Sequence, residues 1–381
     1  MTTALAMKTS SITRLLLWVG IFALSLSSCR KEDEIIPSTE QKGGEAGPAG
    51  PIKGFFLLNE ANMGSNKSTL DYYDYETGKY TRNIYAERNP GVVKELGDVG
   101  NDLQIYGGRM YAVINCSNMV EVIDKHTVKH IGRFTVPNCR YIVFDGGKAY
   151  VSSYAGPVDP SQSQLGYVVE IDTATLKETR RVTVGYQPEQ MQIVDGKLYV
   201  ANSGGYNAPN YEKTVSVVDL ASFTEIKKIE VGINLNLIQK DRKGNLYISS
   251  RGNYKDISSN IYRLDTRTEQ VTSLGITASS FVVLGDSLFA VSLEYPKKKT
   301  TYILYDLEKN VVLSNRFVSS EIATSIKVPY HIAFDERRQY IYICDAKDYT
   351  SPGELLCFDL YGNLLWRQTT GDIPAAIAFL R

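Results

Sequence analysis

The chain has 381 residues, of which 42 are basic and 42 acidic, so it carries no net formal charge at pH 7. This balance argues against nucleic acid as a partner, because proteins that bind nucleic acid normally carry a basic excess or a basic stripe. Tyr is abundant, with 26 residues, and it occurs with Val in short alternating segments rather than in long helical patterns. These features predict an all-β protein.

Residues 1–28 are predicted to be a lipoprotein signal peptide and not part of the fold. Lys8 and Arg14 supply a positively charged start, and the apolar segment of residues 15–26 is too short to span a membrane. The segment ends in Leu26-Ser27-Ser28-Cys29, which resembles a bacterial lipobox. The alternative is an ordinary cleavage site next to an unrelated cysteine.

The lipobox resemblance implies that Cys29 is diacylated and anchors the protein to the outer membrane, since each buried acyl CH₂ group contributes roughly 0.8 kcal/mol. The next residues, 30–34 (RKEDE), resemble the surface-export signal of lipoproteins in Bacteroidetes-type bacteria. That resemblance implies exposure on the cell surface; the alternative is a solvated linker. Residues 35–53 are rich in Gly, Pro and Glu, and we expect residues 29–53 to form a flexible tether.

Residues 54–381 contain a repeat with a spacing of roughly 40 to 50 residues, the period of propeller blades. Each unit reads as four short apolar alternations separated by turns, which predicts four strands. An Asp that ends the third strand marks the register at Asp74, Asp124, Asp172, Asp219, Asp265, Asp306 and Asp359. A second-strand marker stays in phase at Leu57, Tyr111, Tyr150, Tyr199, Tyr247, Phe289 and Tyr342. Seven units predict a seven-bladed β-propeller.

The C-terminal segment is predicted to close the ring. The first unit begins at Gly54 with a second strand and lacks a first strand before it. Residues 373–379 (IPAAIAF) match residues 328–334 (VPYHIAF), the first strand of the last unit. We therefore expect the C-terminal strand to supply the inner strand of blade one, which removes an exposed sheet edge.

The repeat resembles the YVTN-type units of YncE-like propellers. Residues 172–176 (DTATL) and 198–202 (LYVAN) carry this resemblance best. It supports the fold, but a propeller does not specify a function.

Sequence motifs for catalysis or metal binding are absent. There is no G-x-S-x-G elbow and no Walker-type loop. His126 and His130 flank a turn, which disfavours a shared metal ion. We therefore predict no metal site, no cofactor and no enzymatic activity, although propeller enzymes assemble sites from scattered loops. Four cysteines other than Cys29 occur without a C-x-x-C motif and are expected to be buried free thiols: Cys116, Cys139, Cys344 and Cys357.

The loops that join second to third strands are long and carry Tyr with Ser, Asn and Gly, whereas the turns on the opposite face are short. Tyr offers a large amphipathic contact area, and Ser, Asn and Gly offer adaptable hydrogen bonds. With the blade connections on the same face, these loops predict a ligand-binding set of Asn138, Arg140, Tyr154, Tyr186, Gln187, Tyr206, Tyr211, Arg251, Tyr254, Tyr295, Tyr330, His331 and Tyr349. The alternative is that the loops are merely polar and solvated.

The combination of lipobox, acidic run and Tyr-rich propeller resembles the corrinoid-binding surface propeller lipoproteins of gut Bacteroides. Residues 73–78 (YDYETG), 95–102 (ELGDVGND) and 199–206 (YVANSGGY) carry the resemblance. It implies capture of cobalamin or cobinamide and transfer to a TonB-dependent outer-membrane transporter. A corrin is a broad apolar plate edged with amides, which suits a wide mouth lined with Tyr and polar groups.

Two other functions remain open. Glycan capture would also use Tyr and Asn, but the only Trp residues, Trp18 and Trp366, fall in the signal and in an outer strand. A propeller hydrolase with a metal ion in the channel would need acidic or His residues at the starts of the inner strands. The aligned positions hold Gln190, Asn236, Ser279, His331 and Ala376, a poor ligand set for a hard metal ion.

Overall fold

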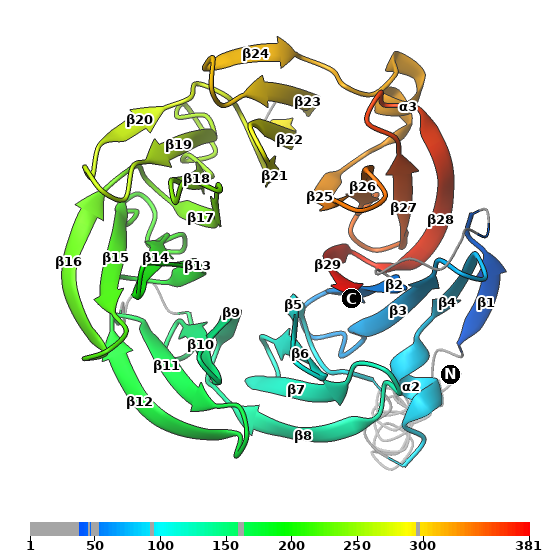
Figure 1. Ribbon diagram of the computed structural model, residues 1–381, viewed down its shortest axis with the longest axis horizontal. Coiled ribbons are helices and arrows are strands. Elements are labelled where there is room, and N and C mark those ends of the chain that lie inside the picture. The colour runs from blue at the N-terminus through cyan, green and yellow to red at the C-terminus, as the bar shows by residue number, and fades with distance from the viewer. Residues whose placement is uncertain (1–37, 45, 47–52, 92–94, 159–163, 295–297) are drawn as a thin grey trace, which may run out of the picture. The chain divides into compact units, whose positions relative to one another are not determined.

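The computed structural model describes residues 38–44, 46, 53–91, 95–158, 164–294 and 298–381. The predicted signal peptide, Cys29, the acidic run and Tyr295 lie outside the described residues. Seven sheets stand around a central axis, as predicted, and form a seven-bladed β-propeller (Figure 1). No helix in the described ranges has the length and apolarity needed to cross a membrane.

Each blade is one antiparallel sheet, in which the first strand named below is innermost, next to the central axis, and the last is outermost. Blade one contains β29 (Pro374–Leu380), β2 (Gly54–Asn59), β3 (Thr69–Asp74), β4 (Lys79–Arg82) and β1 (Thr39–Lys42). Blade two contains β5 (Gly100–Tyr106), β6 (Arg109–Ile114), β7 (Met119–Asp124) and β8 (His130–Thr135). Blade three contains β9 (Cys139–Asp145), β10 (Lys148–Ser153), β11 (Tyr167–Asp172) and β12 (Lys177–Thr183).

The remaining blades repeat this order. Blade four contains β13 (Pro188–Val194), β14 (Lys197–Asn202), β15 (Thr214–Asp219) and β16 (Thr224–Glu230). Blade five contains β17 (Leu235–Lys240), β18 (Leu246–Ser250), β19 (Asn260–Leu264) and β20 (Val271–Ser273). Blade six contains β21 (Ser280–Leu284), β22 (Ser287–Glu294), β23 (Lys299–Asp306) and β24 (Val311–Ser314). Blade seven contains β25 (Pro329–Asp335), β26 (Tyr340–Asp345), β27 (Pro352–Phe358) and β28 (Leu364–Asp372), and two short helices, α2 (Ile84–Arg88) and α3 (Ser320–Ser325), lie in connections.

The seven Asp markers end the third strand of each blade or follow it directly, as predicted. In each blade the carboxylate accepts at least one backbone N–H bond from the turn that follows. Asp124, for example, accepts bonds from the amides of His126 at 3.0 Å and Thr127 at 2.8 Å. Asp side chains favour such turns because they mimic a backbone acceptor. These bonds also lower the pKa of Asp124.

The second-strand markers are buried at the contacts between neighbouring blades. Tyr247 of blade five packs in one cluster with Phe281 of blade six. Tyr342 of blade seven meets Phe55 of blade one, with ring centroids 4.9 Å apart. A buried side chain of this size stabilises the fold by roughly 1.5–3 kcal/mol. At these two contacts the repeated aromatic residue holds one blade to the next.

Side chains of the inner strands also bond directly to the backbone of the following blade. Asp102 accepts the amide of Ile142 at 3.0 Å, and Gln190 accepts the amide of Ile238 at 2.8 Å. Gln190 was aligned with His331 as a residue of the channel mouth, but its side-chain oxygen is used in this contact between blades. Buried amides need such partners, so these bonds fix the spacing of the inner strands.

The C-terminal strand closes the ring, as predicted. Strand β29 pairs antiparallel with β2, with Leu57 opposite Ile377 and Gly54 opposite Leu380. Figure 1 shows the red C-terminal strand beside the blue β2. Leu380 is buried in one cluster with Phe56, so the two ends of the propeller share a hydrophobic core.

The predicted flexible tether of residues 29–53 is corrected in part, because Thr39–Lys42 forms β1. This strand adds a fifth member to blade one by pairing with β4, with Gln41 opposite Tyr80. All four of its residues are exposed. The outer edge of β4 offers unpaired backbone groups, and a polar segment satisfies them without an apolar face.

The four cysteines outside the signal region are free, as predicted. Cys139, Cys344 and Cys357 are buried, whereas Cys116 is only partly buried, which corrects the expectation for that residue. Desolvation by burial raises the pKa of Cys139 to about 12. Such a thiol stays protonated and is a poor nucleophile.

Candidate ligand-binding site

A cavity of about 310 Å³ opens at the end of the ring where the innermost strands begin. We call this end the mouth and the hollow the mouth cavity. Five inner strands contribute their second residue to its wall: Asn101, Arg140, Asn236, Tyr330 and Ala375. The loops after β18 and β26 complete the wall with Tyr254 and Tyr349.

The second residues reach the cavity because the inner strands are irregular there. The pairing register of β25 with β26 shifts between Pro329 and His331, which leaves Tyr330 without an opposite residue. Similar shifts occur at the starts of β5, β9, β13, β17 and β29. A β-bulge leaves an extra residue outside the ladder and redirects its side chain. The bulges therefore place polar side chains at the mouth.

A buried carboxylate, Glu189, bonds to two residues of the cavity wall and joins three blades. Its side chain is only 1% exposed, and it accepts hydrogen bonds from Arg140 Nε at 3.1 Å and Arg251 Nη1 at 2.8 Å. The Tyr154 hydroxyl donates a third bond at 2.5 Å. Burial alone would raise the pKa of Glu189, but the charges of Arg140 and Arg251 outweigh this effect and lower the pKa to about 2.

Each arginine is held by further contacts. Arg251 Nη2 donates to Asn236 Oδ1 at 2.8 Å, and Arg140 lies over the ring of Tyr154, 4.9 Å from its centroid. Both side chains remain partly accessible, with 16% of Arg140 and 28% of Arg251 exposed. Two cations with restricted orientation thus face the mouth cavity.

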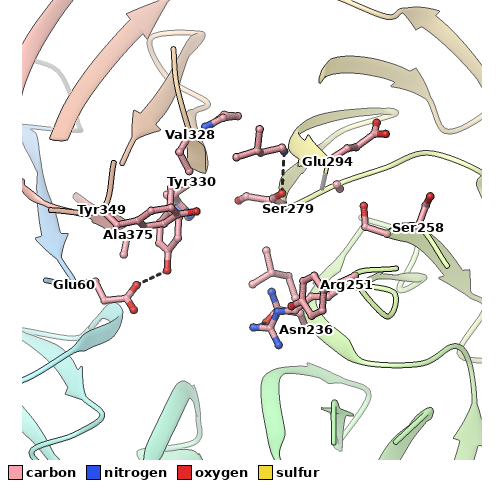
Figure 2. Close-up of a pocket in the computed structure, with 18 of the residues that line it drawn as sticks. Glu60, Asn236, Arg251, Ser258, Ser279, Glu294, Val328, Tyr330, Tyr349 and Ala375 are labelled. Carbon is pink, nitrogen blue, oxygen red and sulfur yellow. Dashed lines mark hydrogen bonds between the residues drawn. The ribbon is translucent and has the colours of Figure 1, made fainter. Parts of the chain in front are cut away.

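A second carboxyl group, Glu60, lines the cavity at the end of blade one. The Tyr330 hydroxyl donates to Glu60 Oε2 at 2.6 Å, and Figure 2 shows this pair across the view from Arg251 and Asn236. Desolvation raises the pKa of Glu60, although the Tyr330 bond and the two arginines oppose it. Tyr330 in turn packs edge-on against Tyr349, with centroids 6.1 Å apart.

His331 lines the mouth cavity, as the repeat alignment predicted. Desolvation lowers its pKa to about 4, so the imidazole is neutral at pH 7. A neutral imidazole has one donor and one acceptor nitrogen and adds no charge to the site.

Six of the predicted ligand-binding residues meet at the mouth cavity. They are Arg140, Arg251, Tyr254, Tyr330, His331 and Tyr349. They come from blades three, five and seven, so the fold brings together residues that are far apart in the chain.

Six other predicted residues lie outside the cavity wall, and the two amide side chains among them hold the loops. Asn138 accepts a bond from Asn115 at 2.7 Å and donates to the carbonyl of Gly156 at 2.8 Å. Gln187 is buried, and its side-chain oxygen accepts the amide of Tyr206 at 2.7 Å. These amide side chains form hydrogen bonds with backbone groups of the loops. The loop composition alone did not reveal this structural role.

The four remaining tyrosines differ in exposure. Tyr154 is buried and uses its hydroxyl on Glu189. Tyr186 and Tyr211 are half-buried. Tyr206 is 59% exposed and packs edge-on against Tyr154, with ring centroids 6.4 Å apart. Tyr206 therefore belongs to the rim of the mouth and not to the cavity wall.

Sequence reasoning missed two acidic residues that decide the electrostatics of the site, Glu60 and Glu189. Glu189 directly precedes Gln190, the residue that the repeat alignment placed at the channel mouth. The site residue of this inner strand is therefore found one position earlier, at the second residue of β13. Asn101 and Tyr141 also line the cavity and were not singled out. The bulges that expose these positions depend on strand pairing, which a single unit of the repeat does not display.

Within the described ranges, no three His, Cys, Asp or Glu side chains are grouped to hold a metal ion. The polar groups around the cavity are amides, hydroxyls, two guanidinium groups, the His331 imidazole, the Lys255 ammonium and two carboxyl groups, Glu60 and Glu294. This arrangement suits hydrogen bonding to a polar ligand.

Fold and cavity together define a seven-bladed β-propeller with a small-molecule-sized hollow at its mouth. The chain belongs to the family described as Domain of unknown function (DUF5074), whose model matches residues 53–318. No curated protein matches the chain.

Solved structures with a similar fold are distant in sequence. A quinonprotein alcohol dehydrogenase-like protein from Bacteroides thetaiotaomicron is 16% identical, with a TM-score of 0.61 over 88% of this chain and 80% of that one. A hypothetical selenium-binding protein from Sulfolobus tokodaii is 11% identical, with a TM-score of 0.63 over 87% and 94% of the two chains. Hydrazine synthase of Kuenenia stuttgartiensis is 14% identical, with a TM-score of 0.54 over 80% and 95%. Identities this low show the fold alone.

Proposed function

We propose that this protein is a lipid-anchored, surface-exposed binding protein that captures a corrinoid at the mouth and passes it to a TonB-dependent outer-membrane transporter. The observation that carries the proposal is the convergence of six predicted residues on one cavity at the loop-bearing end. A hollow lined by aromatic faces and a few directed polar groups is the usual form of a small-molecule site.

The size of the cavity constrains how such a ligand would bind. A volume of about 310 Å³ is at the lower end for small-molecule sites and is smaller than a whole corrinoid. The corrin plate would therefore lie across the mouth, with part of its edge inside. Exposed apolar side chains of the mouth loops, namely Met63, Leu165, Tyr206, Tyr254 and Ile257, would contact the plate.

The amide edge of a corrin needs hydrogen-bond partners in the cavity. Asn101, Asn236 and Ser258 line it and supply both donors and acceptors. A polar ligand edge that meets such groups gains specificity, because any unmatched buried amide is costly.

Glycan capture is the second candidate, since Tyr254 and the amides of the wall would also suit a sugar. Trp366, the Trp residue of the described ranges, packs on Tyr73 with ring centroids 4.7 Å apart and does not line the cavity. A hydrolase is disfavoured because Glu189 is clamped by two arginines and held at a pKa of about 2, which suits a structural carboxylate.

The test is a calorimetric and spectroscopic titration of the purified protein with cyanocobalamin and with dicyanocobinamide. We expect saturable binding of one corrinoid per chain and a change in its visible spectrum. Absence of heat and of a spectral change with both corrinoids would refute the corrinoid proposal, and a glycan array would then test the second candidate.

A further inference from the structure

The mouth cavity contains two guanidinium groups that share one buried carboxylate. Arg140 and Arg251 both line it, and both bond to Glu189, one to each carboxylate oxygen. One anion cannot neutralise two cations, and a buried charge without a full counter-charge is strongly unfavourable. The free site is therefore poor in negative charge beside these two side chains.

We infer that Arg140 and Arg251 form an anion-binding subsite of the mouth cavity, which takes a carboxylate or phosphate group of the ligand. This inference rests on the proposed function for the presence of a ligand and adds the chemistry of one of its groups. A guanidinium group has five N–H donors in a planar fork that matches the geometry of both anions.

Donors remain for such a group after the protein contacts are counted. Arg140 uses Nε on Glu189, and its two terminal nitrogens have no hydrogen-bond acceptor within the described part of the chain. Arg251 uses Nη1 on Glu189 and Nη2 on Asn236. Arg140 therefore offers the larger share of donors, and Arg251 adds charge beside them.

The other charged groups of the wall do not replace a ligand anion. Glu60 also lines the wall, but its Oε2 accepts the Tyr330 hydroxyl at 2.6 Å, and no hydrogen bond joins it to either arginine among the residues that the structure describes. Glu294 accepts the hydroxyl of Thr277 at 3.1 Å, and Lys255 is exposed and adds positive charge at the rim. His331 is neutral at pH 7.

Glu60 acts in this scheme as a competitor of the ligand anion. Arg140, Arg251, Glu189 and Tyr330 are the charged and titratable groups that act on it. A bound anion and an ionised Glu60 would repel each other, so removal of the Glu60 charge should strengthen anion binding. This consequence separates an anion subsite from an arginine pair that serves only the fold.

The experiment measures the melting temperature and binding heat of the full-length protein with inorganic phosphate and, separately, with acetate, at constant ionic strength. Wild type should show saturable stabilisation, Glu60→Gln should bind about tenfold more tightly, and Arg140→Gln at least tenfold more weakly. The ratio of phosphate to acetate affinity identifies the preferred anion. Lys243→Ala is the control, because this exposed lysine lies in a surface ion pair.

Glu60→Gln keeps the test decisive even if Arg140→Gln fails to fold, because it preserves the size of the side chain. No saturable effect of either anion, or weaker binding by Glu60→Gln, would overturn the subsite. Corrinoid binding that is unaffected by Glu60→Gln, together with no anion binding, overturns the subsite and leaves the proposed function standing. Anion binding without any corrinoid binding supports the subsite and overturns the corrinoid proposal.

Discussion

The carboxylate of Glu189 and the guanidinium of Arg251 meet at 2.8 Å, although 62 residues separate them in the chain. Glu189 is the second residue of β13 in blade four, and Arg251 follows β18 in blade five. The contact joins neighbouring blades beside the mouth cavity, so the same ion pair contributes to stability and sets the charge of the site.

Replacement of Glu189 tests the structural part of this role. Glu189→Gln leaves two largely buried arginines without their counter-ion, and we expect the free energy of unfolding to fall by roughly 3–5 kcal/mol. Chemical denaturation measures the change. Glu308→Gln is the control, since the Lys243–Glu308 pair is 61% and 59% exposed and should contribute no more than about 1 kcal/mol. Equal losses in the two variants would contradict the prediction.

The same carboxylate predicts a pH dependence. The pKa of Glu189 is lowered from its ordinary value of 4.5 to about 2, so its contribution is fully present above pH 4.5 and is lost as pH falls towards 2. The shift corresponds to roughly 3 kcal/mol. The difference in unfolding free energy between wild type and Glu189→Gln should therefore shrink from pH 5 to pH 3. A constant difference over this interval would show that the ion pair is not its source.

Closure of the ring by β29 predicts that removal of this strand destabilises the propeller and that a circular permutation restores its stability. A chain of residues 53–372 lacks β29, bares the inner edge of β2 and should aggregate or lose cooperative unfolding. Residues 373–381, joined ahead of residue 53 by a short turn, should restore the fold, because the amide of Lys53 already donates to the carbonyl of Leu380 at 2.9 Å. The chain of residues 53–381 is the reference for both. Melting curves decide, and a truncated chain as stable as the reference would show that β29 is dispensable.

Two exposed tyrosines of the mouth predict different effects on ligand affinity. Tyr254 lines the mouth cavity and Tyr206 lies on its rim, although they are similarly exposed at 57% and 59%. Tyr254→Ala should weaken corrinoid binding by about 2 kcal/mol, roughly thirtyfold, and Tyr206→Ala by clearly less. Lys79→Ala, on the opposite face, should leave the calorimetric affinity unchanged. A larger loss in Tyr206→Ala would mean that the ligand is bound at the rim.

The lipid anchor and surface export are separate predictions on the N-terminal segment. Cys29→Ala should release the protein from membranes, because no acyl chain would hold it. Neutralising Glu32, Asp33 and Glu34 should leave the protein on the membrane but reduce its accessibility to protease on intact cells. Membrane fractionation and protease shaving measure the two effects, and unchanged accessibility in the second variant would refute the export signal.

The blade count could be predicted from the sequence because its signals are local. A carboxylate such as that of Asp124 bonds amides two and three residues ahead, and alternation sets which face of a strand is buried. Closure was also predictable, since β29 repeats the pattern of β25. Strand β1 was not, because its pairing with β4 depends on an open sheet edge and not on its own composition.

The candidate site, like the fold, was predictable only in part. Loop composition, the blade connections and the repeat alignment identified the mouth as the polar, aromatic end, and six residues predicted from them meet at the cavity. It could not separate Tyr254, on the wall, from Asn138 and Gln187, whose amides hold backbone. Such a distinction depends on which atoms lie within hydrogen-bond distance after folding.

By itself, the sequence determined seven blades, their register and the face that carries the long loops, because turn chemistry and strand alternation act over a few residues. Only the tertiary structure decided that Glu60, Arg140, Glu189 and Arg251 share one site. They come from four blades, and their ionisation depends on burial and on one another's charge, which no local pattern contains.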